Sequence, residues 1–143
     1  MHSLAEVLAS GKYHPTLQQS LTYSEGIKSR DTKEYLERIV NRNILREAIQ
    51  KVMADNRVDA LAYPTIRRKA NPIGEAQQDP NCRLGSYSGL PAISVPGGFT
   101  PDGLPVGLEL LGRAWSEPQL IRMAYAYEQS THHRRPPAST PPL

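Results

Sequence analysis

A long amphipathic stretch between residues 32 and 54 constrains this chain more than any other feature. Asp31 and Glu34 have the spacing of a capping box, which marks the start of a helix. Apolar residues on one stripe follow at intervals of three and four: Leu36, Ile39, Val40, Ile44, Ala48, Ile49 and Val52. Charged residues lie mostly on the other side, so we expect a helix that packs one face on something apolar.

Three short segments predict β-strands. Residues 58–63 are mostly apolar and end at Pro64, which is typical of a strand buried on both faces. A second apolar run covers residues 92–95, and apolar residues alternate with others over 106–110. Thr-Pro-Asp-Gly at 100–103 has turn chemistry, so the last two strands should form a hairpin. Residues 64–88 form a long loop, and loops of this length are often functional.

Two more helices are expected. Residues 4–8 have helical spacing, and Gly11 can end that short helix in the left-handed conformation. Ser116 can cap a helix that runs to about residue 130, with Pro118 tolerated in its first turn. Its inward residues would be Leu120, Ile121, Ala124 and Tyr127.

Residues 131–143 are proline-rich and predict a disordered tail after a structured part at 1–130.

The order of these elements predicts an α/β layer structure. A sheet of about three strands with apolar faces would leave open edges and uncovered surface. This favours a piece of a larger domain, which would self-associate where it stays uncovered. The alternative is a non-catalytic α/β module that binds a partner through its exposed sheet edge.

No catalytic or metal-binding constellation is visible. The string nearest to a nucleophile elbow, Gly85-Ser86-Tyr87-Ser88-Gly89, has a tyrosine at the serine position, and its serines should bond backbone. Cys82 is the single cysteine, and the four histidines lie near the chain ends. We therefore expect no catalytic residue, no metal and no cofactor.

Charge and hydropathy narrow the class of partner. The net charge of +3 gathers in the short run His132-His133-Arg134-Arg135, whereas nucleic acid favours an extended basic face, so we expect no nucleic-acid binding. The sequence holds no run of about 18 apolar residues, so we expect no membrane insertion. With no signal peptide visible, a cytoplasmic location is the expectation.

Four strings, in order, resemble amidase-signature enzymes. They are the strand ending in Tyr63-Pro64-Thr65, the Gly-Leu-Pro segment over 88–99, the hairpin strand over 102–112, and the closing helix around Glu117 and Gln119-Leu120. The long helix with Arg42 and Leu45-Arg46 is similar as well. The resemblance covers nearly the whole chain, weakly before residue 30 and strongly from 59 to 130.

The resemblance implies the C-terminal part of an α/β/α sandwich around a mixed sheet, in an enzyme that hydrolyses amides through an acyl-serine. The family's catalytic serines and lysine match nothing here, so an N-terminal half that carries them is expected as the partner. A small amide would bind only in the complete enzyme. Tyr63, Thr65 and Asp79 would then line its pocket, although a loop acid such as Asp79 also commonly bonds local backbone. A further alternative is a fragment of the glutamine-using component of a tRNA-dependent amidotransferase.

Overall fold

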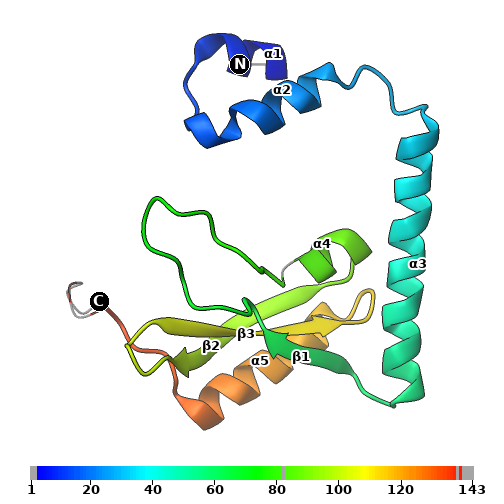
Figure 1. Cartoon of the computed structure of the whole chain (residues 1–143). Coiled ribbons are helices and arrows are strands. Elements are labelled where there is room, and N and C mark those ends of the chain that lie inside the picture. Colours follow the sequence, from blue (N-terminus) through cyan, green and yellow to red (C-terminus); the bar gives the residue numbers. More distant parts are fainter. Residues whose placement is uncertain (1–2, 82, 138, 140–143) are drawn as a thin grey trace. The chain divides into compact units, whose positions relative to one another are not determined.

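The structure is a computed structural model that describes residues 3–81, 83–137 and 139 (Figure 1). The chain divides into two compact units, Met1–Val40 and Asn41–Leu143. Its elements, in chain order, are α1 (Leu4–Ser10), the 3-10 helix η1 (Pro15–Leu17), α2 (Gln18–Gly26), α3 (Lys33–Asp55), β1 (Ala60–Pro64), α4 (Arg83–Ser88), β2 (Ala92–Phe99), β3 (Pro105–Gly112) and α5 (Glu117–Thr131). The α/β class predicted from the sequence is confirmed.

The first unit is helical. The predicted short helix is confirmed as α1, which Ser3 caps through its side chain and which ends at Gly11 with a φ of 60°. Glycine reaches that left-handed conformation without the strain a Cβ would add. Helix α2 was not predicted, because its segment is polar and none of its residues is buried. Without an apolar stripe, periodicity cannot reveal a helix.

Helix α3 begins in the first unit and ends in the second, within one residue of the predicted bounds. Its cap is Thr32 and not Asp31: the Thr32 hydroxyl accepts a hydrogen bond from the Tyr35 N–H at 3.2 Å. The predicted apolar stripe is mostly exposed. Only Ile49 and Met53 are buried on this helix, while Ile44 and Val52 are 57% and 48% exposed.

The second unit contains an antiparallel three-stranded sheet in the order β1-β3-β2. The predicted hairpin of β2 and β3 is confirmed, with a register shift between Pro96 and Gly98. β1 pairs along the other side of β3, from Ala60 opposite Gly112 to Pro64 opposite Leu108. The prediction that the first strand is buried on both faces is wrong, because every residue of β1 stays at least partly exposed.

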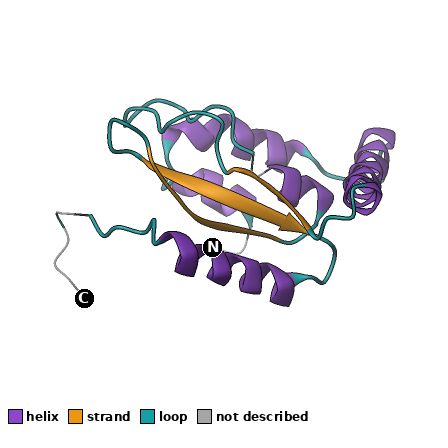
Figure 2. Cartoon of the chain, turned by 90° about the horizontal axis from the view of Figure 1, so that it is seen from below, coloured by secondary structure: helices purple, strands orange, loops and turns teal. Residues whose placement is uncertain are grey.

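Helices cover both faces of the sheet (Figure 1). On one face α5 packs Leu120 and Ala124 against Val95 and Leu110, and Figure 2 shows it lying along the strands. On the other face Met53 and Leu111, both 0% exposed, join Ile49 and Leu90 in a second cluster. These apolar clusters fix the helices on the sheet, because each buried aliphatic side chain stabilises by about 1.5–3 kcal/mol.

Three details of the last segments differ from expectation. Residues 83–88, predicted as loop, form α4. Ser116 does not cap α5 with its side chain, whose hydroxyl instead donates to the Arg113 carbonyl at 2.7 Å. Ile121 is 59% exposed and not inward. The predicted tail at 131–143 lies partly outside the described residues. Among all the residues that the structure describes, no helix is long and apolar enough to cross a membrane.

Candidate functional site

Thr65 and Ser94 meet over the middle strand of the sheet. Thr65 follows β1, and its N–H donates to the Gly107 carbonyl of β3 at 2.9 Å. Its hydroxyl lies 2.5 Å from the hydroxyl of Ser94 on β2. Gly107 stands between them, and a Cβ there would lie only 2.6 Å from Thr65 Oγ1. The absent side chain of Gly107 is therefore what lets the two outer strands bring their hydroxyls together.

A second polar pair lies one row further along the same face. Tyr63 of β1 stands opposite Glu109 of β3, and its hydroxyl donates to Glu109 Oε1 at 2.8 Å. Glu109 is only 5% exposed. Ser94 stands opposite Glu109 on the other side, so the side chains of both pairs point to one face. A buried carboxylate is costly unless it is hydrogen-bonded, and Tyr63 supplies that bond.

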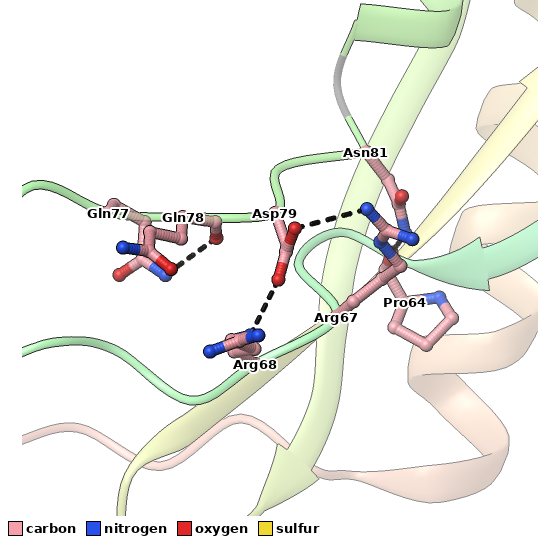
Figure 3. A network of polar contacts seen from close by, with 7 residues as sticks. All are labelled: Pro64, Arg67, Arg68, Gln77, Gln78, Asp79 and Asn81. Carbon is pink, nitrogen blue, oxygen red and sulfur yellow. Dashed lines mark hydrogen bonds and ion pairs between the residues drawn. The ribbon is translucent and has the colours of Figure 1, made fainter.

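Asp79 is held by its own loop (Figure 3). Its carboxylate contacts Arg67 Nη2 at 3.2 Å and Arg68 Nε at 2.5 Å. Its backbone carbonyl accepts from the Arg67 N–H at 3.2 Å, and its φ is 54°. Asn81 closes the loop by donating its side-chain amide to the Pro64 carbonyl at 2.7 Å. Both ends of the loop thus meet at the end of β1.

A cavity of about 690 Å³ lies where β1 and β2 end and β3 begins; we call it the strand-end cavity. Thr65, Ser94 and Gly107 line it, together with residues 66–70 and 133–135. Of the three predicted site residues, Thr65 is in its lining, whereas Tyr63 and Asp79 are not among its lining residues. Asp79 contacts the cavity lining through its ion pairs with Arg67 and Arg68. Ser94 and Gly107, which sequence reasoning did not assign to a site, could be found only from the strand register.

A pair of arginines on α3 fixes the segment that leads into β2. Arg42 donates to the carbonyls of Ser86 and Tyr87 at 3.1 and 2.9 Å, and Arg46 donates to the Ser88 carbonyl at 2.7 Å. These carbonyls end α4, where helical partners are lacking. A cavity of about 730 Å³ beside them includes Arg46 and Glu109 in its lining.

The serines of the imperfect elbow are engaged with backbone, as predicted. Ser88 is 0% exposed, and its hydroxyl donates to the Leu84 carbonyl at 2.6 Å. The Ser86 hydroxyl donates to the Arg83 carbonyl at 3.2 Å. Neither has a basic partner that would activate it as a nucleophile. Among the described residues, which exclude Cys82, no three His, Cys, Asp or Glu side chains gather as metal ligands would.

Comparison with known proteins gives consistent matches. The family model described as Amidase matches residues 4–121. The A component of the glutamyl-tRNA(Gln) amidotransferase of Methanosarcina barkeri is 38% identical over 116 residues, which is 73% of this chain and 24% of that protein.

Solved structures agree with this match. The native peptide amidase from Stenotrophomonas maltophilia superposes with a TM-score of 0.80 and 36% identity, over 96% of this chain and 29% of that one. The A component of the glutamyl-tRNA(Gln) amidotransferase from Thermotoga maritima superposes with a TM-score of 0.60 and 29% identity, over 84% of this chain and 26% of that one. The chain thus spans about a quarter of the length of these relatives.

Proposed function

The chain belongs to the amidase family, and on that premise we propose that it supplies sheet strands and pocket wall to an amide hydrolase that works through an acyl-serine. The observation that carries the proposal is the likeness to the peptide amidase, with a TM-score of 0.80 over 96% of this chain. In this reading the segment corresponds to the C-terminal part of the domain. The rest of the domain, on whichever polypeptide carries it, provides the nucleophile and its base.

Uncovered apolar side chains support a larger domain around this segment. Three large apolar side chains are exposed in or just before α5: Trp115 at 90%, Ile121 at 59% and Tyr125 at 63%. On α3, Ile44 and Val52 are 57% and 48% exposed. Side chains of this size on two elements are unusual for a free surface, and a covering protein layer would bury them. Both outer strands of the sheet also offer an edge to further strands. Without that cover we expect the chain to self-associate.

The polar face of the sheet supports the role as pocket wall. An amide substrate offers one carbonyl acceptor and N–H donors, and hydroxyls can pair with either. Thr65 and Ser94 share one hydrogen bond, in which a single hydroxyl hydrogen lies between the oxygens. The other hydroxyl hydrogen is left to donate. We propose that this pair contacts the substrate and that Tyr63 acts through Glu109 to hold the wall.

A domain exchange tests the proposal. This chain replaces the matching segment of the Stenotrophomonas maltophilia peptide amidase, which is 36% identical to it, and hydrolysis of a peptide amide is measured. We expect turnover by the chimera and none by the isolated chain. A chimera that melts cooperatively yet shows no turnover contradicts the proposal. Turnover by the isolated chain would contradict it too, because the nucleophile would then lie within these residues.

A second candidate is the corresponding component of an amidotransferase, favoured by the name of the Methanosarcina barkeri relative at 38% identity. The same exchange into the Thermotoga maritima protein, followed by glutamine hydrolysis, distinguishes the two. Asp79 is the residue that this reading would assign to the substrate amine. Its two arginine contacts, at 3.2 and 2.5 Å, favour the hydrolase, since they already occupy the carboxylate.

A further inference from the structure

The strand-end cavity is lined by positive charge. Two stretches of chain contribute its cations, Arg67, Arg68 and Lys69 from the long loop and Arg134 and Arg135 from the segment after α5. Among the described residues that line it, none is acidic. Charges of one sign around a concave site focus the potential and raise the local concentration of the opposite ion. The cavity therefore selects for anions.

Neighbouring carboxylates neutralise only part of this charge. Asp79 is shared by Arg67 and Arg68, at 3.2 and 2.5 Å. Asp102 pairs with Lys69 at 2.7 Å. Five cations against two carboxylates leave a formal excess of three positive charges at the cavity.

Arg134 and Arg135 carry most of the uncompensated charge. Within the described part of the chain neither forms an ion pair. The guanidinium carbon of Arg135 lies 5.2 Å from the centroid of the Phe99 ring, within the range of a cation–π contact. That contact holds the charge at the cavity without consuming its hydrogen-bond donors. A guanidinium has five such donors in a geometry that matches a carboxylate.

Part of the remaining lining is apolar, with Val95, Phe99 and Val106 from the hairpin, whereas Thr100 and His133 are polar. A volume of about 690 Å³ falls within the usual 300–1,000 Å³ of small-molecule sites. The hydroxyls of Thr65 and Ser94 add polar contacts at one side. A fitting ligand thus has a small anionic group and an apolar body of modest size.

We propose that the strand-end cavity binds a small organic carboxylate with an aryl or alkyl group attached. Arg134 and Arg135 hold its carboxylate, and the apolar group contacts Phe99 and Val106. The cavity shares Thr65 and Ser94 with the wall proposed for the amide substrate, but the carboxylate is held by Arg134 and Arg135, and its binding is measured without any turnover. A concave cavity whose lining is apolar in part favours a small molecule over a nucleic-acid backbone, which follows an extended basic surface.

Chemical-shift mapping on the isotopically labelled full chain tests this. Phenylacetate is titrated in, with phenylacetamide as its neutral counterpart of nearly equal shape. We expect phenylacetate to shift the amide resonances of Ser94, Phe99 and Val106, and to bind at least tenfold more tightly than the amide. Raising the salt concentration should weaken the binding of phenylacetate and leave the binding of phenylacetamide unchanged.

Matched variants test whether Arg134 and Arg135 bind the carboxylate. Arg134→Gln combined with Arg135→Gln should weaken phenylacetate binding at least tenfold. Arg122→Gln, on the exposed side of α5 and outside the cavity, should leave it unchanged. The same spectra report whether each variant keeps the wild-type fold. Arg134 and Arg135 are both exposed, so we expect their replacement to leave the fold intact.

Three results would overturn the proposal. One is equal binding of phenylacetate and phenylacetamide by the wild-type chain, a comparison that needs no variant. Another is a double variant that retains wild-type affinity. The third is displacement of phenylacetate by a short single-stranded RNA that shifts the same resonances more strongly, which would assign the charge to a nucleic-acid backbone.

Discussion

Replacing Gly107 by alanine should break the contact between the outer strands at the end of the sheet. The new Cβ would lie 2.6 Å from Thr65 Oγ1 and 3.2 Å from Thr65 Cβ. Rotation about the Thr65 side chain can move the oxygen away but leaves Cβ in place. The Thr65 backbone is itself tied to the Gly107 carbonyl at 2.9 Å, so the local chain must also shift.

The size of the effect follows from three contributions. Overpacking costs about 1–3 kcal/mol. Loss of the hydrogen bond between Thr65 and Ser94 costs about 0.5–1.5 kcal/mol. Replacing glycine lowers the entropy of the unfolded chain and offsets about 0.4–1 kcal/mol. The free energy of unfolding should therefore fall by between about 0.5 and 4 kcal/mol, with a central value near 2.

Urea denaturation followed by circular dichroism at 222 nm measures this change. Gly26→Ala is the matched control, because a Cβ at Gly26 would meet nothing within 4 Å. Combining Gly107→Ala with Thr65→Ala removes the clashing oxygen, so the double variant should be more stable than the sum of the single effects predicts. A loss below about 0.5 kcal/mol for Gly107→Ala, or strict additivity in the double variant, would refute the reasoning.

Three further substitutions probe the polar contacts. Arg46→Ala should destabilise the chain by about 1–3 kcal/mol in urea, because the carbonyl of the buried Ser88 loses its side-chain donor. Tyr63→Phe should cost a similar amount, about 1–3 kcal/mol, since the carboxylate of Glu109 then loses its donor. Asp102→Asn should remove the part of the pH dependence of stability that comes from the Asp102 carboxyl group. Hydrogen bonds, chiefly from Lys69 and next from Thr100, lower the pKa of Asp102 from 3.8 to about 2. Its contribution is therefore present above pH 3.8 and lost as the pH falls through about 2.

The first two of these substitutions have a control variant with little expected effect. Arg38→Ala changes an exposed arginine of α3, and Tyr125→Phe changes a tyrosine that is 63% exposed. Either control matching its test variant would assign the loss to helix propensity or packing instead of the named hydrogen bond. For Asp102, identical stability profiles of wild type and variant between pH 2 and 4 would contradict the assignment.

Local patterns in the sequence were enough to predict the long helix, the hairpin and the last helix. Each has an apolar period or a turn dipeptide that acts within a few residues. The caps were less predictable, because Asp31, Thr32 and Ser116 all have side chains that can cap, and backbone geometry decides between them. Helix α4 was missed because Arg42 and Arg46, more than 40 residues earlier in sequence, satisfy its carbonyls.

The site depended even more on long-range arrangement. Thr65 was predicted from its place after a strand, but its partner Ser94 follows only from the registers that align β1 and β2 on β3. Arg134 and Arg135 were expected in a disordered tail. Nothing in the local sequence relates them to residues 66–70, which the structure places around the same cavity.

The two faces of the sheet differ in a way that separates stability from function. The face under α5 is uniformly apolar, with Ile93, Val95, Leu108 and Leu110 in one cluster. The other face changes along the strands, from Leu61 and Leu111 under α3 and α4 to Tyr63, Glu109, Thr65 and Ser94 toward the strand ends. Apolar residues in that second set would avoid the cost of burying Glu109. The polar half of this face therefore stabilises the sheet less than an apolar surface would, which fits the role of pocket wall proposed for it.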